Sequence, residues 1–131
     1  MLYSQKVLDH FHNPHNHGEI SSPSASAQVG NPVCGDIIKF DLEIGQRPKD
    51  DGSNESYIKD VKFQTMGCAA AISVSSVMTD MVIGQSLEQA SQVSFEDIVK
   101  ELDGLPPIKI HCAQLVRECL LKAIEHYEES Q

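Results

Sequence analysis

Seven residues in the first third of the chain, Ile38 to Ile44, alternate strictly between apolar and charged side chains. Because successive side chains of a β-strand point to opposite faces, this pattern predicts a strand with one face on a core and the other in water. A second strand is predicted over residues 57–66, where Val61, Phe63 and Thr65 share one face. The intervening residues 47–55 are rich in Asp, Gly, Ser and Asn, which predicts a long hairpin loop.

Helical periodicity accounts for much of the remaining chain. Small and polar residues fill positions 18–26, and two adjacent prolines at 106 and 107 predict an extended segment over residues 105–110. The expected helices are one capped by Ser4 and ended by Pro14, one running from just after Gly67 to a cap at Gly84, two short ones starting at Ser86 and Ser94, and a last one starting at His111 and Cys112. This order predicts an α+β fold, with helices on one side of an antiparallel sheet.

The length and charge of the chain exclude several classes of function. The 131 residues fit one compact domain, residues 1–131. Lys plus Arg number 10 and Asp plus Glu 19, without any basic stripe, so nucleic acid is not expected as a partner. The longest apolar run, around residues 68–72, is too short for a membrane span, and the first residues lack a signal-peptide pattern. We therefore expect a cytoplasmic protein without a membrane partner, whose four cysteines are thiols, ligands or core residues.

Three of the four cysteines are predicted at element boundaries. Cys34 precedes a strand, whereas Cys68 and Cys112 each open a helix, where the unpaired N–H groups favour a thiolate. A single free cysteine is more often a small buried hydrophobe, and Cys119 fits that description because it lies in the apolar stripe of the last helix. The neighbours Asp36 and His111 favour function for the other three. Their spacing alone does not show that they meet.

Two further clusters of polar residues suggest solvated loops. His10, His12, His15 and His17 could bind a transition metal, but they are expected to follow a helix end among turn-forming residues. The Asp50-Asp51 pair lacks the carboxylate spacing of a calcium loop. The sequence contains no phosphate-binding loop, dinucleotide fingerprint or nucleophile elbow.

Four ordered segments carry a family resemblance: residues 3–14, Cys34-Gly35-Asp36, Gly67-Cys68-Ala69 and residues 105–112. At these segments the chain resembles the iron-sulfur cluster assembly scaffolds of the IscU type, which are also similar to the N-terminal domain of NifU proteins. The resemblance implies a three-stranded antiparallel sheet covered by helices. It also implies one exposed site that gathers Cys34, Asp36, Cys68, His111 and Cys112.

The resemblance further implies a carrier protein and not an enzyme. Such a scaffold receives sulfur from a cysteine desulfurase, with Cys112 as the persulfide acceptor here, and collects iron with help from a frataxin-like protein and a ferredoxin. It then passes a [2Fe-2S] cluster to apo acceptor proteins. Residues Leu105, Pro106, Pro107, Ile108 and Lys109 would be the contact of an Hsp70-type chaperone, and a homodimer is compatible with the resemblance.

The ligand chemistry leaves alternatives open. Three thiolates are available, so the fourth ligand would be Asp36 or His111, and a carboxylate ligand would make the cluster labile. The same groups could hold zinc tetrahedrally, as in a zinc-dependent sulfurtransferase that accepts sulfur from a desulfurase, or in a structural zinc module. The presence of His111 together with the prolyl segment favours the scaffold.

Overall fold

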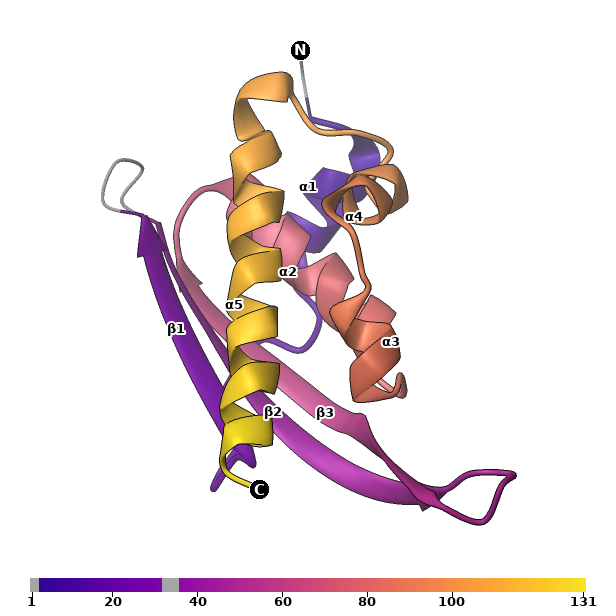
Figure 1. The fold of residues 1–131 in the computed structure, drawn as a ribbon. Helices are drawn as coiled ribbons and strands as arrows, with labels where there is room; N and C mark the ends of the chain where they lie inside the picture. The colour runs from indigo at the N-terminus through magenta and orange to yellow at the C-terminus, as the bar shows by residue number, and fades with distance from the viewer. Residues whose placement is uncertain (1–2, 32–35) are drawn as a thin grey trace.

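The computed structural model describes residues 3–31 and 36–131 and has the expected α+β architecture (Figure 1). Its antiparallel sheet has the order β1-β2-β3, formed by β1 (Ala25–Asn31), β2 (Asp36–Pro48) and β3 (Asn54–Met66). The helices are α1 (Gln5–His12), α2 (Ala69–Val82), α3 (Leu87–Ser91), α4 (Phe95–Glu101) and α5 (Ile110–Glu129), with a 3-10 turn, η1 (Pro107–Lys109), before the last. Helix α5 packs along β1 and β2, and α2 contacts β3.

The three-stranded sheet implied by the resemblance is confirmed, but the residue pattern left one strand unplaced and one loop too long. The residue pattern did not locate β1, because among residues 25–30 only Ala27 and Val29 face the core and the strand forms through its pairing with β2. The predicted hairpin loop, residues 47–55, is also too long, since the ladder continues to the Pro48–Asn54 pair. Arg47 supports this extension by donating from Nε to Glu55 Oε2 at 2.6 Å, across the two strands.

The charged face of β2 is not wholly exposed to water. Asp41 was predicted to face solvent, but its side chain is buried because residues from the preceding segment reach it. The Ser26 hydroxyl donates to Asp41 Oδ1 at 2.7 Å and the Ile20 N–H donates to Oδ2 at 3.1 Å. These bonds replace the water that the buried carboxylate loses.

The helix boundaries mostly follow the predicted caps. Ser4, Ser86 and Ser94 each accept a hydrogen bond from the backbone N–H three residues on. Gly84 follows α2 with a φ of +86°, a conformation that favours glycine. The predicted extended segment 105–110 is wrong in its second half, because Pro107 begins a 3-10 turn and Ile110 begins α5. Proline suits the first position of a helix, where its fixed φ is already helical.

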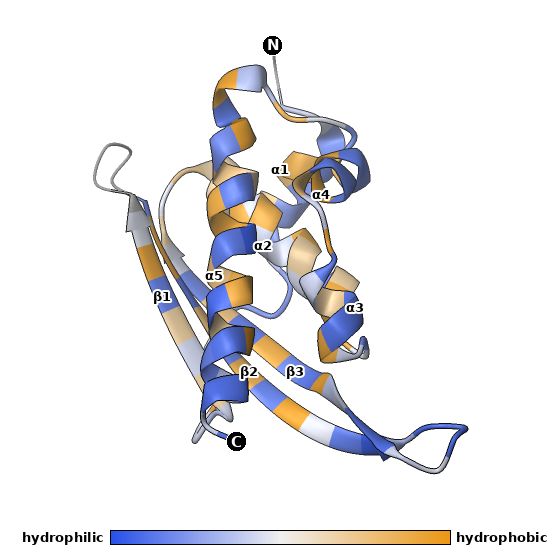
Figure 2. Cartoon of the chain, viewed as in Figure 1, coloured by the Kyte–Doolittle hydropathy of each residue, from blue (hydrophilic) through white to orange (hydrophobic). Residues whose placement is uncertain are grey.

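The core lies between the sheet and the helices. Figure 2 shows apolar and polar residues alternating along the strands and around α5, so these elements turn one apolar side inward, whereas most residues of α2 are buried. Cys119 is part of this core, as predicted: it is fully buried, and burial raises the pKa of its thiol to about 12. No helix within residues 3–31 and 36–131 has the length and apolar character that a bilayer crossing requires.

Candidate metal centre

Three elements bring four of the predicted site residues together. Asp36 is the first residue of β2, Cys68 is the N-cap of α2, and His111 and Cys112 lie in the first turn of α5. Cys34, the fifth predicted residue, lies outside the described residues. Convergence of residues so far apart in the sequence therefore holds for four of the five.

The donor atoms of Asp36, His111 and Cys112 lie within 4.8 Å of one another, close enough to share a metal ion. The Sγ atoms of Cys68 and Cys112 are 3.7 Å apart, and Asp36 Oδ2 lies 4.0 Å from the first and 3.9 Å from the second. A tetrahedral metal with metal–sulfur bonds of about 2.3 Å needs sulfurs separated by about 3.8 Å. The two thiols therefore already stand at the separation that such an ion requires.

The imidazole of His111 is oriented as a ligand. Its Nδ1 is 2.9 Å from the carbonyl oxygen of Ile108, and because a carbonyl only accepts, Nδ1 carries the proton. The other nitrogen, Nε2, then holds the lone pair, and it lies 3.6 Å from Cys112 Sγ. A backbone carbonyl that fixes the tautomer in this way is common behind metal-binding histidines.

The carboxylate of Asp36 reaches the two sulfurs only because residue 67 is glycine. A Cβ at Gly67 would lie 2.8 Å from Asp36 Oδ1, a distance that real Cβ atoms essentially never show, and 3.0 Å from Asp36 Cγ. Asp36 itself is only 5 % exposed, so it has little space in which to retreat. Gly67 therefore acts on the site through the space it leaves.

The two thiols share one negative charge, held on Cys68. The hydrogen bond from Cys112, followed by a backbone N–H of α2, lowers the pKa of Cys68 to about 5. That same bond, together with burial, raises the pKa of Cys112. The exposed ammonium of Lys109 faces the Cys68 thiolate, which raises the pKa of Lys109. At neutral pH the pair is thus one thiolate and one thiol.

The site is less exposed than the resemblance implied. Cys112 is fully buried and Asp36 nearly so, whereas Cys68 and His111 are partly exposed. The first turn of α5 causes this difference, because it places Cys112 on the side of the helix that faces the core. Cys68 is consequently the more accessible of the two sulfurs.

Only part of the predicted partner segment is available at the surface. Leu105 and Pro106 are buried, but Pro107 is exposed and Ile108 is 78 % exposed. The division falls at the start of η1, because Leu105 and Pro106 precede this turn and none of its own residues is buried. A partner would therefore meet Pro107 and Ile108 first.

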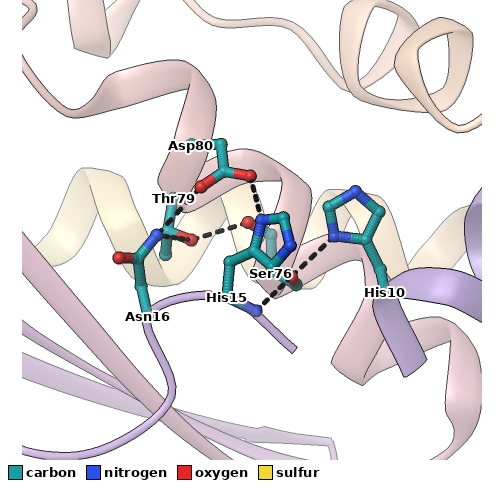
Figure 3. A network of polar contacts seen from close by, with 6 residues as sticks. All are labelled: His10, His15, Asn16, Ser76, Thr79 and Asp80. Atoms are coloured by element: carbon teal, nitrogen blue, oxygen red, sulfur yellow. Dashed lines mark hydrogen bonds and ion pairs between the residues drawn. The ribbon is translucent and has the colours of Figure 1, made fainter. Parts of the chain in front are cut away.

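A second group of potential ligands lies on another part of the molecule. The histidine-rich stretch was predicted to be a solvated loop after a helix end, but His10 and His12 belong to α1. The structure brings His10 and His15 to Asp80 of α2, as Figure 3 shows. Sequence analysis missed Asp80, and no sequence pattern pointed to it. In the structure Asp80 lies four residues after Ser76, which contacts both histidines.

The chain resembles known proteins along nearly its whole length. Residues 2–131 match the family model described as the NifU-like N terminal domain. The chain is 45% identical over 125 residues to the iron-sulfur cluster assembly scaffold protein IscU of Aquifex aeolicus, covering 95% of this chain and 75% of the relative. It is 38% identical to the protein of the same name from Escherichia coli K12, covering 100% of this chain and 98% of the relative.

Solved structures share the fold. A candidate iron-sulfur cluster assembly scaffold for the SUF system from Fervidobacterium islandicum superposes with a TM-score of 0.70 at 22% identity, covering 93% of this chain and 96% of the other. The N-terminal part of a NifU-like protein from Brucella abortus gives a TM-score of 0.69 at 20% identity, covering 97% and 94%. At these identities the likeness establishes the three-stranded sheet with its helical cover, and the fold alone.

Proposed function

Because the chain belongs to the family of NifU-like N-terminal domains, we propose that it is a scaffold on which a [2Fe-2S] cluster is assembled and then passed on. It acts as a carrier and not as an enzyme, through a single domain spanning residues 1–131. The observation that carries this proposal is the meeting of two thiols, 3.7 Å apart, with a carboxylate and an imidazole at the junction of β2, α2 and α5.

The ligands of the cluster would come from Cys34, Asp36, Cys68, His111 and Cys112. Stable ferredoxin clusters use four thiolates, whereas this chain offers three for the purpose and must complete the set with a harder oxygen or nitrogen donor. Both Asp36 and His111 lie within 4 Å of Cys112 Sγ, so both can serve. A carboxylate binds iron less tightly than a thiolate does, which suits a cargo that must leave.

Cys112 is our proposed acceptor of sulfur. Its thiolate would attack the terminal sulfur of a persulfide on a cysteine desulfurase, forming a new S–S bond on Cys112 and releasing the donor's thiolate. Cys68, which is already a thiolate, can take the Cys112 proton through their hydrogen bond. Because Cys112 is buried, the first turn of α5 has to open for this transfer. Trapping the persulfide in Cys68→Ser and Cys112→Ser variants by mass spectrometry identifies the acceptor.

Cys68 is the competing acceptor. Its partial exposure and its low pKa favour direct attack without any opening of α5. If the persulfide formed on Cys68 in the Cys112→Ser variant at the unmodified rate, and was absent from Cys112 in the unmodified protein, Cys68 would replace Cys112 in this role.

Partners follow from the same proposal. A frataxin-like protein and a ferredoxin would help to supply iron and electrons, and apo acceptor proteins would receive the cluster. The exposed Pro107 and Ile108 form the accessible part of the proposed contact for an Hsp70-type chaperone. A cytoplasmic, reducing environment would keep the thiols available.

Anaerobic reconstitution tests the scaffold function. The protein is incubated with ferrous iron, cysteine and a desulfurase, and the visible charge-transfer spectrum of the cluster is recorded. We expect Cys34→Ser, Cys68→Ser and Cys112→Ser to lose the spectrum, while Cys119→Ser, altered in the core, serves as the matched control. Normal assembly in all three site variants would overturn the assignment.

A zinc-dependent sulfurtransferase is the second candidate. The 3.7 Å between the two sulfurs supports it, because that separation fits a single tetrahedral ion. Iron, zinc and acid-labile sulfide analysis of anaerobically purified protein distinguishes the two functions. Tightly held zinc, with no sulfide-containing cluster after reconstitution, would favour the sulfurtransferase.

A further inference from the structure

His10, His15 and Asp80 form a polar cluster between α1, the segment that follows it, and α2 (Figure 3). The His15 Nδ1 lies 2.5 Å from Asp80 Oδ2, and the two imidazole rings are 4.8 Å apart between centroids. Each of the three side chains offers one ligand atom, and these atoms lie within 4.8 Å of one another. Two imidazoles and one carboxylate are a common ligand set for a divalent transition metal.

Surrounding bonds already hold the cluster in place. The buried Ser76 hydroxyl lies 2.7 Å from His10 Nδ1, and it accepts the backbone N–H of His15 at 2.8 Å. On the other side, Asn16 donates to Asp80 Oδ1 at 3.0 Å. Metal ligands in proteins are commonly oriented by such outer hydrogen bonds, which fix the rings and raise their basicity.

The cluster has access to solvent. His10 and Asp80 line a surface cleft of about 430 Å³, together with Lys6, Asp9, Val77, Met81 and Glu101. The cleft therefore presents three carboxylates and one ammonium, and this net negative charge attracts a cation. Burial, followed by the neighbouring His15, lowers the pKa of His10.

We propose that His10, His15 and Asp80 bind a divalent transition-metal ion of the zinc class, with water completing its coordination. A tetrahedral ion with bonds of about 2.0–2.1 Å needs ligand atoms about 3.4 Å apart, so the cluster has to adjust by about 1 Å. The His15 and Asp80 side chains are 54% and 43% exposed and have the freedom to do so.

This site is separate from the cysteine-containing one. Asp80 lies twelve residues after Cys68 on the same helix, which corresponds to about 18 Å along the axis. Thiolate is absent from its ligand set, so it would hold a resident ion and no cluster. A bound ion would tie the segment after α1 to α2, and would thereby stabilise the folded state by RT ln(1 + L/Kd), where L is the free metal concentration.

Zinc titration by calorimetry tests the proposal on the full chain. We expect the unmodified protein to bind one more equivalent of Zn²⁺ than the His15→Gln variant does, whatever the cysteine site binds. His12→Gln is the matched control, because it removes an exposed imidazole of the same stretch that lies outside the cluster. Equal stoichiometry and affinity in the unmodified and His15→Gln proteins would overturn the proposal.

Two further measurements guard against a folding artefact. Asp80→Asn keeps the shape of the side chain, removes its charge, and should weaken the same Zn²⁺ equivalent at least 10-fold. In the unmodified protein, the ring-nitrogen resonances of His10 and His15 should shift on adding Zn²⁺ while those of His12 do not. Unchanged resonances for both rings, at zinc concentrations that saturate the protein, would refute the site without any variant.

Discussion

Gly67→Ala should displace the carboxylate of Asp36 without removing any ligand. The new Cβ would lie 2.8 Å from Asp36 Oδ1, about 0.6 Å short of the 3.4 Å at which ordinary van der Waals contact begins. The new Cβ would also lie 3.2 Å from Ala71 Cβ, which limits how far the methyl group can move. Because Asp36 is only 5 % exposed, the carboxylate has to shift against packed neighbours, and overpacking of this kind costs about 1–3 kcal/mol.

The consequence for metal binding follows from that displacement. If Asp36 is a ligand, moving it should weaken Zn²⁺ binding by about 10–100-fold, the range seen when a ligand loses its orientation. The affinity is measured by competition with a chromophoric chelator, and the free energy of unfolding by urea denaturation of the metal-free protein. Together these two readouts separate damage to the ligand set from damage to the fold.

Gly30→Ala is the matched control for this variant. Its Cβ would also approach Asp36, but at 3.7 Å from the backbone oxygen, which is an ordinary contact. We expect this control to bind Zn²⁺ with unchanged affinity. A Gly67→Ala protein that was destabilised but bound Zn²⁺ as tightly as the control would show that Asp36 is not a ligand, and unchanged stability and affinity would refute the steric reasoning altogether.

Further variants test the charge, the lability and the packing of the molecule. With a pKa of about 5, Cys68 should be alkylated by iodoacetamide at a rate that is constant above about pH 6 and falls as the pH drops through 5. Cys112→Ala should move this pH profile toward higher pH, because it removes the hydrogen bond that stabilises the Cys68 thiolate. A profile centred near pH 9 in the unmodified protein would contradict the shared charge. Asp36→Ala should slow the release of a reconstituted cluster to an acceptor, followed by the change in its visible spectrum, and faster loss would count against a labilising role. Ser75→Ala should raise the free energy of unfolding, measured by urea titration, by about 1 kcal/mol. The reason is that within the described ranges Ser75 Oγ is buried with no hydrogen-bond partner. A loss of stability would reveal a partner for that hydroxyl.

The sequence predicted those elements whose stability depends on local patterns. The alternation around Ile38 to Ile44 and the serines at positions 86 and 94 are local features, and the structure confirms the strand and the two helix caps that they predict. Strand β1 was missed because its small side chains give a weak period, and its partner strand supplies the hydrogen bonds. The predicted extended segment, residues 105–110, ends after Pro106 in the structure. Proline restricts the residue before it, but Pro107 itself fits the start of a helical turn.

The candidate site was predictable in composition but not in its chemistry. Boundary positions and family resemblance selected Asp36, Cys68, His111 and Cys112, yet neither could indicate which sulfur would be buried. Burial depends on the side of α5 that faces the core, and thus on where the helix begins relative to the η1 turn. For the same reason the His10, His15 and Asp80 cluster escaped the sequence pattern, since its histidines and its carboxylate meet only when α1 packs on α2.

The unequal pair of thiols has a consequence for a protein that has to release its cargo. A metal ion needs both sulfurs as thiolates, but the resting site supplies only the Cys68 thiolate, so loading has to remove a proton from Cys112, whose pKa is raised. That proton returns when the metal leaves, which makes the empty site more stable than two opposed thiolates beside the Asp36 carboxylate would be. The two sulfurs are therefore placed for binding, while the raised pKa of Cys112 favours return of its proton and release of the metal.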